Sequence, residues 1–441
     1  MNTLLIAVLA GIVVLLVLIL WVRLHAFIAL LIASLVTGLL AGMDPVLLLK
    51  AIQDGMGGTL GFVAVIIGLG AMFGAMLEVS GGAQAIAAAL LQKFGIRQTP
   101  WAMVLTGFLV AIPVFFDVAL IILIPVLFSL QRRTGASILT FGIPLLAGLV
   151  VTHSFVPPTP GPVAVAEILG ADLGMVILTG VLAGLPAAVV GGIFWGRYIS
   201  GKIYVAAPDS VNDTAEVELP SASLIFILIL LPIVLILLRT LVPSDQHSAG
   251  LVQTIALIGH PFVALTIANL LAWYLLGIRN GMSRQRLLQI TSRSFAPAGT
   301  IILLTGAGGV FKQVLMETGS GEMLANSLTS VGVPVILFAF ISAVLVRVLQ
   351  GSATVAMITA AGLTAPLLAS GSYSQIHLAC ITVAIAGGAT FLSHVNDSGF
   401  WLVSQYLGLS EKQTFRSWTV MTMLVGMTGL VSAILIFAIT R

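Results

Sequence analysis

The densest polar cluster in the sequence interrupts an apolar stretch near its C-terminal end. Five polar side chains stand within the six residues from Ser393 to Ser398, and the residues around them are hydrophobic. The Asp397 carboxylate and the His394 imidazole could carry a proton, while the hydroxyl and amide groups could hydrogen-bond a small polar ligand. Asp397 alone could instead cap a helix that starts at Ser398. So many polar groups in one place favour a binding site over a cap.

Prolines interrupt two earlier apolar stretches. Residues 152–162 include four prolines and one glycine, so this stretch cannot form a continuous helix. The carbonyl groups that the prolines leave without donors could bind water, an ion or a ligand. His153 in this stretch is either a ligand-binding residue or a satisfied core histidine. In the other stretch Pro113 precedes Asp117, which either caps the next helix or binds a ligand or a proton.

A fourth interruption, residues 350–355, is rich in small residues and hydroxyl groups. Such a segment lets a ligand approach the backbone closely, and the amides at the start of the next helix attract an anion. Arg347 lies just before it in an apolar helix. This arginine either binds a carboxylate or neutralises an internal acid, for which Glu317 and Asp397 are the candidates.

The composition indicates the class of protein that contains these segments. Of 441 residues, 59% are hydrophobic and only 7% are charged, with a mean hydropathy of +1.18. Soluble globular proteins carry about 25% charged residues, so a polytopic membrane protein is expected. The net charge of +3 comes from a few loop residues and does not indicate nucleic-acid binding. Because Cys380 is the one cysteine, a fold held together by disulfide bonds is excluded, and Cys380 is expected in the core.

The apolar stretches predict an all-α protein with about ten transmembrane helices and two re-entrant hairpins. The first stretch, 4–22, is long enough to span a membrane and lacks the features of a cleaved signal peptide. Regions 102–130 and 334–369 are too long for one crossing and are broken in the middle, so each is expected to be a hairpin. The other expected spans are 26–42, 60–78, 137–168, 174–196, 222–242, 251–277, 298–316, 375–408 and 418–440.

The two halves of the sequence resemble each other. His25-Ala-Phe-Ile-Ala-Leu matches His260-Pro-Phe-Val-Ala-Leu, and repeated halves are typical of secondary transporters. The loop at 43–58 has a net negative charge, whereas the equivalent loop at 278–297 carries four arginines. Equivalent loops of opposite charge predict inverted repeats. Placing the basic loop inside puts most of the 18 basic residues in the cytoplasm and both termini in the periplasm.

The repeats set the expected domains. Residues 1–200 are expected to form the first repeat, 201–221 a cytoplasmic linker and 222–441 the second repeat. The unwound helices of both halves are expected to meet near the membrane midplane. Helices with few internal breaks suit a static scaffold, and the broken ones suit a moving transport part. The scaffold is predicted at 3–42 and 222–277, and the transport part at 60–196 and 298–440.

Seven segments along the chain form an ordered set of motifs. They are His25-Ala-Phe-Ile-Ala-Leu30, Gly57-Gly-Thr-Leu-Gly61, Phe115-Phe-Asp-Val118, Val156-Pro-Pro-Thr-Pro-Gly-Pro162, Gly306-Ala-Gly-Gly-Val-Phe-Lys-Gln-Val-Leu315, Gly351-Ser-Ala-Thr-Val-Ala356 and Ser393-His-Val-Asn-Asp-Ser-Gly-Phe-Trp401. With this set the chain resembles, over nearly its whole length, the gluconate permease family of bacterial proton symporters, within the wider ion transporter superfamily. The chain departs from the family's pattern at Asp117, where many members have Glu, and at Thr159, where many have His.

The resemblance implies uptake of a sugar acid together with a proton across the bacterial inner membrane. It also implies a homodimer in which a transport domain moves against a scaffold. The expected function is therefore secondary active import of gluconate or a related aldonate by proton symport, with an elevator-type movement. The alternatives are a passive facilitator or channel for small organic anions, and a carrier of another small hydroxy or amino acid.

Several functions are not expected. The motifs of zinc proteases, of serine hydrolases and of phosphate-binding loops are missing from the sequence, so neither an enzyme nor an ATP-driven pump is expected. No cofactor and no metal are expected, and sodium coupling at the unwound carbonyl groups stays open as an alternative to proton coupling.

The expected substrate contacts are spread over the four interruptions. The substrate carboxylate is expected at Ser352 and Thr354, and its hydroxyl groups at Ser393, Asn396 and the region of Thr159. The candidates for proton coupling are Asp117, His153, His394 and Asp397. The full set of expected substrate-binding residues is Phe116, Asp117, His153, Ser154, Thr159, Gly161, Gly351, Ser352, Thr354, Ser393, Asn396 and Asp397.

Overall fold

The computed structural model describes residues 2–207, 219–242, 250–319, 333–368 and 371–440. Every regular element in these ranges is a helix, and seven helical stretches within them are long and apolar enough to cross a membrane. The predicted all-α polytopic membrane fold is confirmed. Part of the predicted linker 201–221 lies outside the described residues. In the described part of the linker, the Val205 amide donates a 3.2 Å hydrogen bond to Ser137 Oγ.

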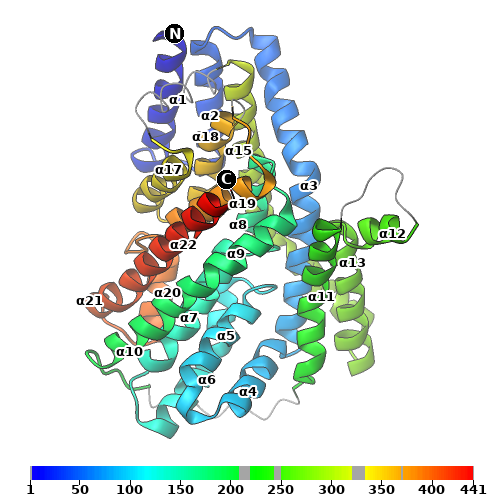
Figure 1. Cartoon of the computed structure of the whole chain (residues 1–441), viewed down its shortest axis with the longest axis vertical. Helices are drawn as coiled ribbons and strands as arrows, with labels where there is room; N and C mark the ends of the chain where they lie inside the picture. The colour runs from blue at the N-terminus through cyan, green and yellow to red at the C-terminus, as the bar shows by residue number, and fades with distance from the viewer. Residues whose placement is uncertain (1, 208–218, 243–249, 320–332, 369–370, 441) are drawn as a thin grey trace.

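The helices of the first half are coloured from blue to green in Figure 1. They are α1 (Asn2–Leu20), α2 (Ala26–Leu40), α3 (Pro45–Val79), α4 (Gly82–Phe94), α5 (Thr99–Val110), α6 (Phe116–Thr134), α7 (Leu139–Phe155), α8 (Pro160–Leu169), α9 (Leu173–Ala188) and α10 (Trp195–Ser200). A π-helical turn, Val189–Phe194, joins α9 to α10.

The second half has the same order of helices. They are α11 (Ala222–Leu241), α12 (Gly250–Ile258), α13 (Pro261–Ala272), α14 (Arg284–Arg293), α15 (Phe295–Glu317), α17 (Val335–Gln350), α18 (Ala353–Leu368), α19 (Gln375–Thr390), α20 (Ser398–Tyr406), α21 (Glu411–Thr414) and α22 (Val420–Ile439). A π-helical turn, Phe415–Thr419, joins α21 to α22.

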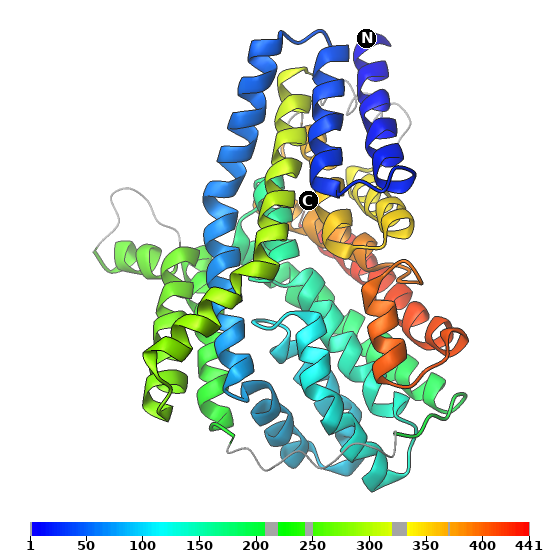
Figure 2. The same cartoon turned by 180° about the vertical axis from the view of Figure 1, so that it is seen from behind.

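The packing of the helices repeats between the halves. Helix α1 packs on α2 as α11 packs on α13, and α5 packs on α7 as α17 packs on α19. The long helices α3 and α15 lie side by side and run in opposite directions (Figure 2). His25 and His260 cap α2 and α13 in the same way, because each Nδ1 accepts a 3.3 Å hydrogen bond from the amide two residues later. These observations agree with an inverted repeat.

Three predicted boundaries were wrong. The predicted loop 43–58 is largely helical, because Asp44 caps α3 and Pro45 occupies its first turn, so the helix starts well before the predicted span 60–78. The predicted loop 278–297 contains α14. The single span predicted at 251–277 is broken after α12, where His260 caps α13. Helix α4, which is shorter and less apolar than the spans, was not predicted.

A close helix crossing holds α5, the first helix of the hairpin region 102–130, against α7. Helices α5 and α7 approach at Gly107 and Gly148, where an added Cβ would lie 2.3 Å from the Leu145 carbonyl oxygen and 2.2 Å from the Val104 carbonyl oxygen, respectively. Only a residue without a side chain permits this approach. The crossing fixes the C-terminal end of α7, which carries His153.

Gly148→Ala is expected to lower stability by about 1–3 kcal/mol, because the new methyl group forces α5 and α7 apart. The measurement is the apparent Tm of the purified protein in detergent. Gly58→Ala is the matched control, since its added Cβ would meet no atom within 4 Å in helix α3. Equal Tm values for the two variants would contradict the importance of this crossing.

Candidate functional site

A cavity of about 530 Å³ lies where the helix interruptions meet. Its walls include the start of α6, the end of α7, the turn between α17 and α18, and the start of α20. The π-helical turn before α22 contributes Trp418, α22 contributes Thr422, and the first turns of α15 contribute Pro297 and Ile301. Segments from both halves of the chain therefore form one cavity, as the sequence predicts.

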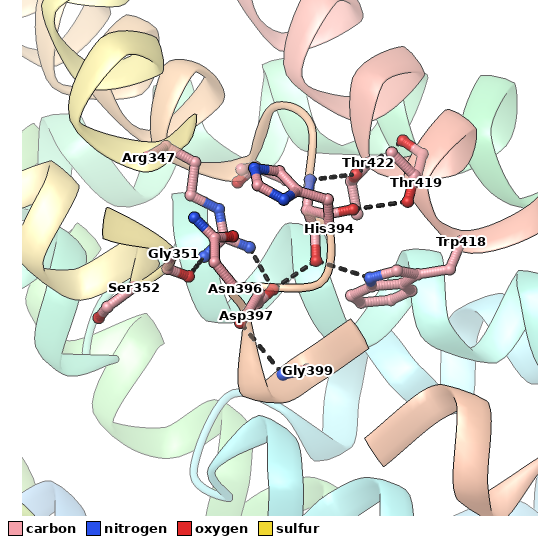
Figure 3. A network of polar contacts seen from close by, with 12 residues as sticks. Arg347, Gly351, Ser352, His394, Asn396, Asp397, Gly399, Trp418, Thr419 and Thr422 are labelled. Atoms are coloured by element: carbon pink, nitrogen blue, oxygen red, sulfur yellow. Dashed lines mark hydrogen bonds and ion pairs between the residues drawn. The ribbon is translucent and has the colours of Figure 1, made fainter. Parts of the chain in front are cut away.

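Asp397 is the centre of the polar contacts beside this cavity (Figure 3). Its carboxylate forms an ion pair with Arg347 and accepts a hydrogen bond from the Ser393 hydroxyl. It also accepts a 3.1 Å hydrogen bond from the amide of Gly399, which makes Asp397 the cap of α20. Asp397 therefore caps α20 and also lines the cavity.

The π-helical turn Phe415–Thr419 and the start of α22 fix the fourth interruption through Ser393. The Trp418 indole donates a 2.7 Å hydrogen bond to Ser393 Oγ, and the Thr419 hydroxyl donates one of 2.6 Å to the Ser393 carbonyl oxygen. The Ser393 amide donates to Thr422 Oγ1 at 3.1 Å (Figure 3). Ser393 does not line the cavity, and its role is to position Asp397.

Arg347 joins the third interruption to the fourth. Its side chain comes from the last turn of α17, is 4% exposed, and donates to the Gly351 carbonyl oxygen as well as to Asp397. Its Nε has no hydrogen-bond partner in the described part of the chain. Of the two acids that the sequence left open, Arg347 pairs with Asp397, whereas Glu317 accepts a 2.8 Å hydrogen bond from Gln313.

Gly351 lets the two interruptions touch. Its φ of +92° lies in the left-handed region, and a Cβ at this position would lie 2.1 Å from the Asn396 carbonyl oxygen. Two further bonds join the same segments: the Asn396 side-chain amide donates to the Val348 carbonyl oxygen at 2.9 Å, and His394 Nε2 lies 3.0 Å from that oxygen. The contact makes the α17–α18 turn and the fourth interruption one unit.

Asp117 faces this unit from the first turn of α6. Its side chain is exposed to the cavity that it lines, and its carboxylate has no hydrogen-bond partner among the described residues. It lines the same cavity as Asp397, so the two carboxylates belong to one site. His153 lines the same cavity from α7, and its Nδ1 is buried with no partner in the described structure.

Nine of the twelve predicted substrate-binding residues line the cavity, and three do not. Thr159 donates a 2.6 Å hydrogen bond to the Val156 carbonyl oxygen, Gly161 packs against Met357, and Ser393 lies behind Asp397. The nine residues that line it are Phe116, Asp117, His153, Ser154, Gly351, Ser352, Thr354, Asn396 and Asp397. His394, the further candidate for proton coupling, turns toward the Val348 carbonyl oxygen.

The predicted set omitted Arg347, Trp418 and Thr422, although all three line the cavity. Arg347 had a visible signal, because it is a lone cation in an apolar helix. Trp418 and Thr422 had none, since they lie in an unbroken apolar stretch. No three His, Cys, Asp or Glu side chains come together as metal ligands in the ranges that the structure describes.

Comparison with known proteins decides the family. The family model described as GntP family permease matches residues 3–439. The chain belongs to this family. The permease is 39% identical over 441 residues to the low-affinity gluconate transporter of Escherichia coli (strain K12), covering 99% of this chain and 98% of the relative. It is therefore a multi-pass membrane transport protein and not an enzyme.

Other relatives give the same result. The gluconate permease of Pseudomonas aeruginosa is 40% identical over 422 residues, 94% of this permease and 93% of the relative. The Gnt-II system L-idonate transporter of E. coli K12 is 35% identical over 439 residues, 99% of each chain. The crystal structure of the Alcanivorax borkumensis YdaH transporter is similar in fold, with a TM-score of 0.63, 16% identity, and coverage of 90% of this chain and 89% of that chain.

Trp418→Phe is expected to lower stability by about 1 kcal/mol and to weaken substrate uptake severalfold, because Ser393 loses a hydrogen bond and no longer holds Asp397 in place. Initial uptake rates and Tm are the measurements. Trp195→Phe is the control, since its indole donates a similar 2.9 Å hydrogen bond to the Ser417 carbonyl oxygen, away from the cavity. An equal loss of uptake in both variants would mean that the Trp418 bond is only structural.

Proposed function

We propose that this permease imports a sugar acid, gluconate or a related aldonate, together with a proton, by exposing the cavity alternately to the two sides of the membrane. The named substrates of the relatives, gluconate and L-idonate, support the sugar acid. The cavity adds support, because its volume of about 530 Å³ is in the usual range for small-molecule sites.

The charge of the cavity is the observation that carries proton coupling. Its described lining residues include two carboxylates, Asp117 and Asp397, and one guanidinium, Arg347. With His153 neutral, the wall has a net charge of −1 before any substrate binds. A sugar acid adds a third carboxylate in a poorly hydrated place, where unpaired charges are costly. A proton that enters with the substrate removes the added charge.

The polar groups around the cavity match a polyhydroxy acid. The start of α18 contributes Ser352, Ala353 and Thr354 to the cavity wall, and the Ser352 hydroxyl accepts a 3.4 Å hydrogen bond from the Val355 amide. Such a helix start binds a carboxylate. Asn396, Thr354 and Ser154 offer amide and hydroxyl groups to the hydroxyls of the sugar.

The movement in this proposal is of the elevator type. The helices that flank the interruptions pack on one another, since α8 packs on α18 and on α19. Helix α1 packs on α2, α2 packs on α15 and α13 packs on α3, which suits a static frame. We assign this frame to the interface of a homodimer in the bacterial inner membrane, with both termini in the periplasm.

Uptake by the purified protein in liposomes tests the function. With radiolabelled gluconate and an inward proton gradient, gluconate is expected to accumulate above its external concentration, and a protonophore is expected to abolish the accumulation. Equilibration without accumulation would indicate a passive facilitator. Accumulation that depends on a sodium gradient would mean that sodium, and not a proton, is the coupled ion. Competition by a panel of aldonates names the substrate, and no uptake of any of them would reject a sugar acid.

A further inference from the structure

We propose that Arg347 binds the substrate carboxylate by exchanging it for Asp397, and that Asp397 takes the coupled proton when Arg347 leaves it. The inference rests on the proposed function, because it needs an anionic substrate. In this inference one ion pair, Arg347–Asp397, both binds the substrate carboxylate and couples its binding to a proton. Arg347 then determines the specificity for acids over neutral sugars.

The geometry puts Arg347 in reach of a ligand. It lines the cavity and is its one cation among the described residues. A guanidinium has five N–H donors, and Arg347 uses Nη1 for Gly351 and Nη2 for Asp397, while Nε stays without a partner. A carboxylate that enters the cavity therefore meets a guanidinium held by an internal carboxylate that occupies the place of a ligand, and the buried Nε becomes a further donor once the side chain turns.

The exchange makes proton uptake necessary. Once Arg347 turns to the substrate, an ionised Asp397 is left buried without a cation, beside a cavity that the Asp117 carboxylate also lines. A buried charge that loses its partner is strongly unfavourable. Protonation of Asp397 removes this charge, so substrate and proton bind together and neither binds well alone.

Ser393 can accommodate both protonation states of Asp397. In the present structure the Ser393 hydroxyl donates to the Asp397 carboxylate and accepts from the Trp418 indole. A hydroxyl oxygen has two acceptor lone pairs. When Asp397 is protonated, its O–H can donate to Ser393 while Trp418 keeps its bond. The Gly399 amide bonds to Asp397 in either state.

Other titratable groups face the ion pair from the neighbouring helices. They are Asp117 on α6, His153 on α7, and His394 in the same interruption. A second cavity of about 320 Å³ is lined by Glu78 and Arg293, and it shares Phe115, Val118 and Pro297 with the first. None of these groups is bonded to Arg347. Asp397 is thus the group whose surroundings change when Arg347 changes partner.

Calorimetric binding of gluconate to the purified protein, in buffers of different ionisation enthalpy, counts the protons taken up. Wild type is expected to take up protons as gluconate binds. Asp397→Asn is expected to bind gluconate without proton uptake and with an affinity that no longer depends on pH. Glu78→Gln, the matched control, removes a carboxylate that lines only the neighbouring cavity and is expected to retain the uptake. Proton uptake that persists in Asp397→Asn, or is lost only in Asp117→Asn, would overturn the exchange.

A second variant isolates Arg347. The pair Arg347→Gln with Asp397→Asn is neutral and can keep a hydrogen bond, so it leaves no buried charge. Compared with Asp397→Asn alone, it is expected to bind gluconate about 30-fold or more weakly, because the ligand carboxylate loses its guanidinium. Equal affinities would overturn the assignment of Arg347.

The failure of the exchange is distinguishable from failure of the proposed function. Wild type that binds no aldonate, or that transports gluconate without protons, contradicts the function and the exchange together. If wild type binds an aldonate and transports gluconate with protons, but the Asp397→Asn variant still takes up protons, only the exchange is overturned.

Discussion

Replacing Arg347 with alanine is expected to destabilise the permease by about 3–5 kcal/mol, because it leaves the buried Asp397 without its cation. The loss exceeds the value of one hydrogen bond, since the Gly351 carbonyl oxygen also loses its donor. Both partners come from interruptions that lie far apart in sequence, so the contact between them loosens as well. The measurement is the apparent Tm of the purified protein in detergent.

Two controls separate this effect from the loss of any arginine. Arg279→Ala removes an exposed arginine from the turn after α13, and its stability is expected to change by no more than about 0.5 kcal/mol. The double variant Arg347→Gln with Asp397→Asn is expected to recover most of the stability, since no charge is left unpaired. A Tm for Arg347→Ala equal to that of wild type would mean that Asp397 does not depend on this pair for its burial.

The four interruptions could be predicted because their causes are local. Prolines, glycines and clustered polar residues disrupt a helix wherever the chain folds, so the sequence itself marks residues 152–162 and 393–398. The partner of Arg347 could not be chosen in the same way. Asp397 lies 50 residues from Arg347 in the chain, and only the fold brings the α17–α18 turn to the fourth interruption.

The missed start of α3 has a different cause. Lys50 and Asp54 gave the segment the composition of a loop, yet both are exposed on one side of the helix. Leu48 and Ala51 on the other side are buried with Val314 of α15. Their spacing is helical, so a search for periodicity would have found the helix where composition did not. Trp418 and Thr422 carry no comparable signal, because their polar atoms matter only through contact with Ser393.

Gly351→Ala is expected to reduce uptake by about 100-fold, because it displaces the α17–α18 turn from the fourth interruption. Two effects act together. A side chain at a left-handed φ costs about 1–3 kcal/mol. The added Cβ would also lie 2.1 Å from the Asn396 carbonyl oxygen, and backbone on both sides leaves no flexible group to yield. The turn must move, and Arg347 and Asp397 move apart with it. Initial uptake rates per folded protein in liposomes are the measurement.

Gly135→Ala separates these two effects. Gly135 caps the end of α6 with a φ of +67°, so alanine there has the same conformational strain, but its Cβ would meet no atom within 4 Å. This control is expected to lose stability and to keep its uptake rate. If both variants lost uptake equally, the strain of the backbone would explain the result, and the contact between Gly351 and Asn396 would have no special part in it. A loss confined to Gly351→Ala means that transport requires the two interruptions, one from each side of the Arg347–Asp397 pair, to stay in contact.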